Sequence, residues 1–70
     1  MKISARNQLA GRVRKITEGA VMTEIVVELD GGQEVVAAIT AESARRLGLA
    51  EGSRVVALVK STEVMIAVED

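Results

Sequence analysis

Hydrophobic and polar residues alternate along most of this chain, which is typical of β-strands that turn one face toward a core. Glycines interrupt the alternation near positions 19, 31, 48 and 52. The segments between these breaks that we predict as strands are residues 3–16, 20–29, 33–39, 54–60 and 63–68. In the second segment, Thr23, Ile25 and Val27 share one face, whereas Glu24 and Glu28 lie on the other.

Two glycine-containing stretches refine this prediction. The sequence LDGGQ, residues 29–33, is typical of a hairpin turn between the second and third strands. Gly11 interrupts the first strand. Because glycine inside a strand often marks an irregularity, we expect a bulge or a sharp bend there.

One short helix is predicted between the third and fourth strands. Thr40 is a good N-cap, residues 41–47 tolerate a helix, and Gly48 suits the position after its end. Arg45 and Arg46 fall in the last turn, where the helix dipole favours cations. Five strands with a helix after the third predict an all-β fold. We expect an OB-fold-like five-stranded barrel that forms a single domain over residues 1–70.

The last three predicted strands are apolar on both faces. Each strand has one apolar face, and apolar residues also lie on its second face. These residues are Val36 and Ala38 in the third strand, Val56 and Leu58 in the fourth, and Met65 in the fifth. Strands of this kind are usually buried on both sides, and a barrel of 70 residues has only one inside. Scattered apolar residues that face solvent are an alternative reading. We expect the outer surface to pack on another copy of the chain.

Composition excludes several classes of function. The chain has no aromatic residue and a net charge of −1, which argues against a nucleic-acid binder with a basic surface and base-stacking rings. It has no Cys and no His, and no carboxylate lies in an obviously apolar setting, so we expect neither an enzyme nor a metal-cation site. There is no long apolar run and no signal-peptide core, so we expect a cytoplasmic protein.

Three clusters of hydrogen-bond donors stand out. Ser4 and Arg6 lie two residues apart on a predicted strand, so their side chains share a face, although a solvated surface arginine is the simpler reading. Lys60 and Ser61 end an apolar strand at a turn whose amides could bind an anion, or whose hydroxyls serve only the turn.

The third cluster, Thr40 and Ser43, lies at the start of the predicted helix. Free amides and the helix dipole favour an anion there, whereas simple capping explains Thr40 alone. Together the three clusters offer hydroxyls, a guanidinium, an ammonium and amides. Such a set suits a fully deprotonated tetrahedral oxyanion, all of whose oxygens are acceptors. Molybdate, tungstate or sulfate is therefore favoured over a protonated phosphate.

The sequence also resembles a known family, the molbindins, over essentially its whole length. The stretches that carry the resemblance are SARNQ at 4–8, ELDGGQ at 28–33, ITAES at 39–43 and VKSTEVM at 59–65. Molbindins are small molybdate-binding proteins built from one Mop-type domain of the TOBE group. The resemblance implies an OB-like barrel and a homohexamer, a trimer of dimers, that holds molybdate or tungstate at subunit interfaces for cytoplasmic storage and homeostasis.

The resemblance also implies particular site residues. One class of oxyanion site corresponds here to the residues Ser4, Arg6, Lys60 and Ser61 of one subunit and Thr40 and Ser43 across the interface. A second class, formed by backbone amides on a threefold axis, corresponds to Gly19, Ala20 and Val21. The alternatives are an OB-fold nucleic-acid binder and a purely structural or sensing oligomer.

Overall fold

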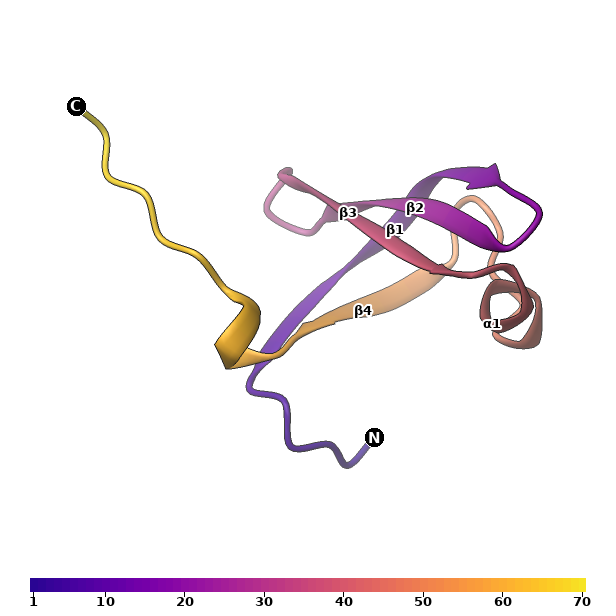
Figure 1. Cartoon of the computed structure of the whole chain (residues 1–70), viewed down its shortest axis with the longest axis horizontal. Coiled ribbons are helices and arrows are strands. Elements are labelled where there is room, and N and C mark those ends of the chain that lie inside the picture. The colour runs from indigo at the N-terminus through magenta and orange to yellow at the C-terminus, as the bar shows by residue number, and fades with distance from the viewer.

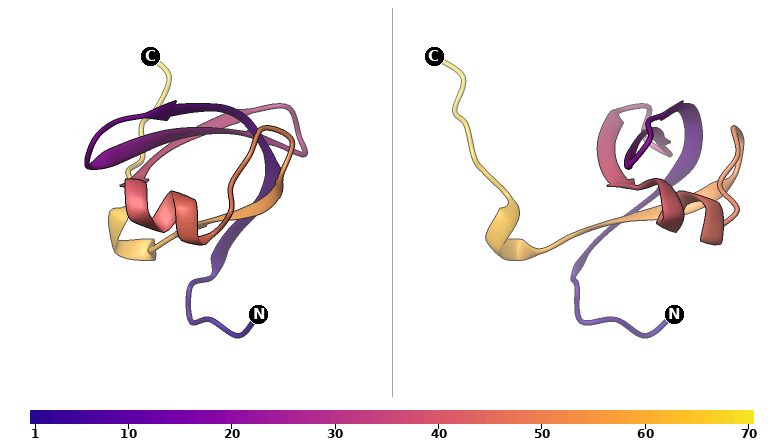
Figure 2. Two further views of the ribbon diagram at one scale, coloured as in Figure 1. Left: turned by 90° about the vertical axis from the view of Figure 1, so that its right-hand side faces the viewer. Right: turned by 45° about the vertical axis from the view of Figure 1, so that its right-hand side comes forward.

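The computed structural model describes residues 1–70 and shows a mostly β protein (Figure 1). The elements in chain order are β1 (Asn7–Glu18), β2 (Met22–Leu29), β3 (Glu34–Thr40), α1 (Ala41–Arg46), β4 (Arg54–Val59) and the 3-10 turn η1 (Ser61–Glu63). The four strands form one antiparallel sheet in the order β3-β2-β1-β4. The sheet curls around its concave face to make an open half-barrel, which Figure 2 shows from two sides.

The two ends of the chain differ from the prediction. Residues 1–6 form no strand, so the first strand begins at Asn7 rather than at residue 3. The predicted fifth strand, residues 63–68, is wrong for the single chain: after η1, residues 64–70 have no regular structure and run away from the sheet (Figure 1). A strand needs a neighbour to hydrogen-bond with, and this segment has none within its own chain.

The core lies on the concave face of the sheet. Val13, Ile25 and Val27 form its centre, each at most 4% exposed. The predicted inward face of β2 is confirmed, because Thr23 is also buried on it, while Glu24 and Glu28 face solvent. Only eight of the 70 residues are buried, which is little for a chain that is nearly half hydrophobic. A single copy therefore leaves much of its apolar surface in contact with water.

The hairpin and the helix follow the sequence prediction closely. The β2–β3 turn closes through hydrogen bonds from the Leu29 amide to Gln33 and from the Gly32 amide to Leu29, at 2.7 and 2.8 Å. The N-cap is Thr40, whose hydroxyl accepts the Ser43 amide. Gly48 has a φ of +64°, which glycine adopts without strain, and so ends the helix. No helix in the structure has the length and apolar character needed to cross a membrane.

Gly11 has a different role from the one predicted. The register of β1 against β2 shifts between Val13 and Lys15, so the bulge lies at Arg14 and not at Gly11. Gly11 is instead buried where the two strands approach closely, and a Cβ there would overlap the carbonyl oxygen of Glu28 and lie 2.9 Å from Val27. Glycine is required because the neighbouring backbone occupies the space of a side chain.

An apolar groove remains open between the two edge strands, β3 and β4. Its lining consists entirely of hydrophobic residues: Ile25, Val27, Val35, Val36, Ala37, Ile39, Leu47, Leu49, Val55, Val56, Ala57, Leu58 and Val59. The groove lies where a fifth strand would close the barrel, since both edges of the sheet border it. The free tail has the matching character, with Met65, Ile66 and Val68 each at least 85% exposed.

Candidate functional site

A polar hollow lies at the end of the sheet where both chain termini leave it. Its volume is about 420 Å³, many times the roughly 30 Å³ that a water molecule occupies in the liquid, so a tetrahedral oxyanion fits. The lining residues are Ile3, Ser4, Ala5, Arg6, Leu58, Lys60, Ser61 and Thr62. The first two donor clusters predicted from the sequence thus line one site, although more than 50 residues separate them along the chain.

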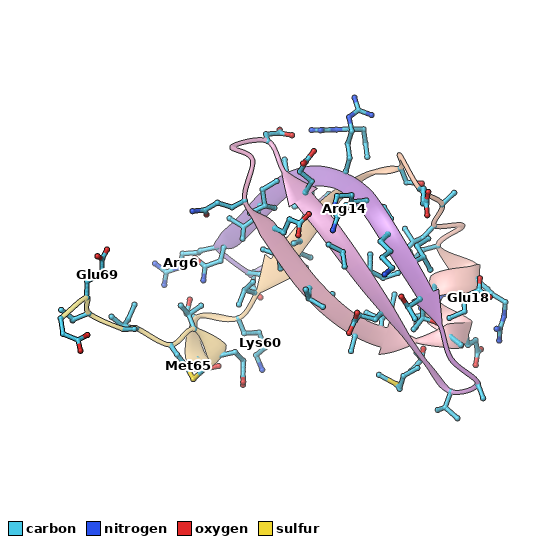
Figure 3. All side chains as sticks on the ribbon, turned by 90° about the horizontal axis from the view of Figure 1, so that it is seen from above. Arg6, Arg14, Glu18, Lys60, Met65 and Glu69 are labelled. Carbon is cyan, nitrogen blue, oxygen red and sulfur yellow. The ribbon has the colours of Figure 1, made fainter.

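The pairing of β1 with β4 brings the two clusters together. Asn7 opposes Val59 at the end of this ladder. Ser4 and Arg6 therefore precede the first paired residue of one strand, while Lys60 and Ser61 follow the last paired residue of the other. Figure 3 shows Arg6 and Lys60 at this same end of the sheet. Antiparallel pairing makes the start of one strand the neighbour of the end of the other.

A side chain that the sequence prediction left out holds this end of the ladder. The Asn7 side-chain amide donates to the carbonyl oxygen of Val59 at 3.1 Å, and the contact is partly buried. The neighbouring Gln8 amide donates to the carbonyl oxygen of Ala5 at 2.8 Å and so fixes the N-terminal segment. Sequence alone marked these residues as part of a polar stretch but gave no sign of which backbone group each would meet.

The hollow is electropositive. Neither a glutamate nor an aspartate lines it. The salt bridges of the protein are Arg14–Glu34 and Arg54–Asp30, so Arg6 and Lys60 have no ionic partner. A guanidinium, an ammonium and hydroxyls with no nearby carboxylate leave donors free for an anion, and guanidinium–oxyanion hydrogen bonds are among the stronger ones in proteins.

Thr40 and Ser43 do not line this hollow in the single chain. They belong to the start of α1, and the Thr40 hydroxyl donates to the Ser43 hydroxyl at 2.8 Å while it accepts the Ser43 amide at 3.0 Å. Capping therefore explains Thr40 within one copy. The two residues could join Ser4 and Arg6 only if they came from another copy.

The predicted amide site, Gly19, Ala20 and Val21, forms the exposed turn between β1 and β2. No hydrogen bond of the protein uses the amide N–H of any of the three as its donor. The Val21 carbonyl accepts the amide of Ala41 at 2.8 Å, which fixes the turn against the helix. Three free amides on a fixed turn could bind an anion.

Asp30 and Arg54 form the best-defined ion pair, away from the hollow. The Arg54 guanidinium donates to both carboxylate oxygens, at 2.8 and 3.2 Å. These hydrogen bonds hold the pKa of Asp30 below its ordinary value of 3.8 and raise the pKa of Arg54. The pair joins the β2–β3 turn to the start of β4, so its role is structural.

Comparison with known proteins shows which family the chain matches. The TOBE domain family matches residues 3–66. Molybdenum-pterin-binding protein 2 of Clostridium pasteurianum is 47% identical over 66 residues, which are 94% of this chain and 97% of the relative.

Two solved structures share the fold as well as the sequence. A molybdate-binding protein from Sporomusa ovata is 48% identical, with a TM-score of 0.90 over 96% of this chain and 98% of that one. The cytoplasmic molybdate-binding protein ModG, in a form with molybdate bound, is 52% identical, with a TM-score of 0.84 over 87% of this chain and 43% of that one.

These relatives are binding proteins by name, in agreement with the expectation that the chain is not an enzyme. The match covers nearly the whole chain in both sequence and fold. The chain belongs to the TOBE-domain family, among the Mop-type molybdenum-pterin-binding proteins known as molbindins.

Proposed function

We propose that this chain binds molybdate or tungstate reversibly at sites shared between copies of itself, for storage and homeostasis of molybdenum in the cytoplasm. The observation that carries the proposal is the hollow in which Ser4, Arg6, Lys60 and Ser61 meet without a carboxylate. Binding involves no bond made or broken. The molybdate-bound ModG relative supports the choice of ligand, and its description as cytoplasmic supports the compartment.

The donor set favours a fully deprotonated anion. Arginine and lysine only donate hydrogen bonds, and the lining offers no carboxylate to accept a proton from the ligand. Molybdate and tungstate present four acceptor oxygens, whereas phosphate near neutral pH carries a proton that needs an acceptor. We therefore expect the hollow to prefer molybdate and tungstate over phosphate.

A second copy completes the site in this proposal. The hollow is open to solvent, and the Thr40 and Ser43 hydroxyls lie elsewhere in the same chain. Both edges of the sheet are unpaired, the groove between them is wholly apolar, and the tail that would fit it is free. Exchange of tails between two copies would close both barrels as the predicted five-stranded fold, because an added strand supplies backbone hydrogen bonds and apolar side chains together.

Association of dimers into a larger assembly would use exposed apolar residues outside the groove. Val21 and Met22 are exposed apolar residues that do not line the groove. Their burial between dimers would produce the homohexamer expected from the resemblance, a trimer of dimers. The turn at Gly19, Ala20 and Val21 would then supply the second class of oxyanion site, with its free amides as donors.

Calorimetric titration with molybdate, tungstate, sulfate and phosphate tests this function. We expect saturable binding of molybdate and tungstate and little binding of phosphate, and sulfate, which is also fully deprotonated, should bind better than phosphate. Bound ligand should also raise the melting temperature, because a ligand that binds only the folded state stabilises it by about 2.7 kcal/mol at a hundredfold excess over Kd. Equal binding of all four anions would contradict the proposed selectivity, and no binding of molybdate would contradict the function.

A further inference from the structure

The hollow lies between the two chain segments that leave the sheet at this end. Residues 1–6 form its N-terminal wall, and the turn that begins the tail, with Lys60 and Ser61, forms the other. Figure 3 shows Lys60 at the root of the tail, with Met65 farther along it and Glu69 near its end. Any ligand in the hollow is therefore in contact with the hinge from which the tail departs.

Few contacts fix the direction of the tail in the free chain. The hinge turn is closed by the Glu63 amide, which donates to Lys60 at 2.9 Å, and by a long contact of 3.5 Å from the Val64 amide to Ser61. No hydrogen bond or salt bridge joins residues 65–70 to the rest of the protein. Such weakly held segments change direction at low cost in free energy.

The positive charges of Arg6 and Lys60 oppose the approach of the two segments that border the hollow. Arg6 belongs to the N-terminal segment and Lys60 to the hinge, and neither has an ionic partner. Two cations that share a hollow repel each other. A dianion between them would reverse the sign of this interaction and draw the two segments together.

We propose that the bound oxyanion acts as a latch on the hinge, so that occupancy of the hollow slows release of the tail from the neighbouring copy. This inference rests on the proposed function. The anion joins Arg6 to Lys60 and Ser61, and so fixes the angle at which the tail leaves β4. The bound anion also raises the affinity of the tail for the neighbouring copy, and by thermodynamic linkage a seated tail raises the affinity of the hollow for the anion by the same factor.

Subunit exchange of the 70-residue chain tests the latch. The protein has no cysteine, so Glu51→Cys, at an exposed turn outside the hollow, gives one site for a donor or an acceptor dye. Two labelled populations are mixed with and without molybdate, and energy transfer reports the rate at which copies exchange. We expect molybdate to slow exchange by up to the equilibrium coupling between the hollow and the tail, which is about tenfold for a typical pair of coupled sites.

Matched variants test whether the response of the exchange rate to molybdate depends on the hollow. Arg6→Gln removes the N-terminal half of the latch, and its exchange rate should no longer respond to molybdate. Arg12→Gln changes the same residue type on β1, outside the hollow, where Arg12 donates to the carbonyl oxygen of Gly52. The exchange rate of this control should still respond. Hydrogen exchange of the amides of residues 64–70 gives a second readout, and molybdate should protect them.

Calorimetric titration of the same samples with molybdate distinguishes failure of the latch from failure of the proposed function. Molybdate that binds but leaves both the exchange rate and the tail amides unchanged contradicts the latch and leaves the proposed function in place. A chain that binds molybdate as a monomer also contradicts the latch. If molybdate does not bind, both the proposed function and the latch are wrong.

Discussion

Asn7 and Val59 form the last pair of the β1–β4 ladder, and the Asn7 side chain ties them together by donating to the Val59 carbonyl oxygen at 3.1 Å. This contact spans 52 positions of the sequence and joins two residues whose sequence neighbours line the hollow. Arg6 immediately precedes β1 and Lys60 immediately follows β4, so both are next to this pair in the sequence. The position of the two cations relative to each other therefore depends on an amide that touches neither of them.

Replacement of Asn7 should weaken both the fold and anion binding. In Asn7→Ala the partly buried Val59 carbonyl loses its side-chain donor, which should lower the free energy of unfolding by about 1–2 kcal/mol. Molybdate affinity should also fall, because the cations lose their fixed spacing. Urea unfolding and calorimetry measure the two effects. Gln8→Ala removes an exposed amide that bonds only three residues away, and it should change stability less.

Replacement of Arg6 should affect binding far more than stability. Arg6 is exposed and makes no salt bridge, so Arg6→Ala should leave the melting temperature of the free protein nearly unchanged. Loss of a charged hydrogen-bond donor costs about 1.5–3 kcal/mol, which corresponds to roughly a ten- to hundredfold rise in the Kd for molybdate. Arg12→Ala is the matched control on β1. An Arg6→Ala protein that binds as tightly as the control would place the site elsewhere.

Substitution of Gly11 tests the close approach of β1 and β2. The new methyl group in Gly11→Ala would overlap the Glu28 carbonyl, and overpacking of this kind costs about 1–3 kcal/mol. Gly31→Ala adds the same methyl group where no atom lies within 4 Å and φ is not positive, so it should change stability by less than about 0.5 kcal/mol. Equal melting temperatures for the two variants would contradict the packing described here.

The Asp30–Arg54 pair should make stability depend on acidity. The pKa of Asp30 is lowered in the folded protein, so the folded state favours the carboxylate. Its contribution is fully present above the ordinary pKa of 3.8 and is lost as the pH falls through the lower folded-state value. The stability difference between the wild type and Asp30→Asn should therefore shrink in acid. Urea unfolding at neutral and acidic pH measures it, and a difference that grows in acid would contradict this sign.

Much of the fold could be predicted because it depends on local patterns. The alternation in residues 22–29 identified the buried face of β2, and Thr40 and Gly48 marked the two ends of the helix. The structure of the tail could not be predicted from a local pattern. Its alternating apolar residues are typical of a strand, but a strand also needs a partner, and the partner edge is not recorded in the segment itself.

The candidate site was predictable in part for the same reason. Residue type and spacing placed Ser4 with Arg6 and Lys60 with Ser61, and the pairing of β1 with β4 joined the two clusters. The bulge at Arg14 and the contact between Asn7 and Val59 were missed, because each depends on how two distant strands meet in space. Such contacts leave no pattern in a single sequence.

Native mass spectrometry of the 70-residue chain in the presence of molybdate tests whether the anion is held between subunits, because one spectrum counts the copies of the chain and the bound anions together. We expect assemblies built from pairs of copies, with a hexamer as the largest, and molybdate retained only in those assemblies. Molybdate retained by single copies, or assemblies that retain none, would contradict the claim that the anion is held between subunits.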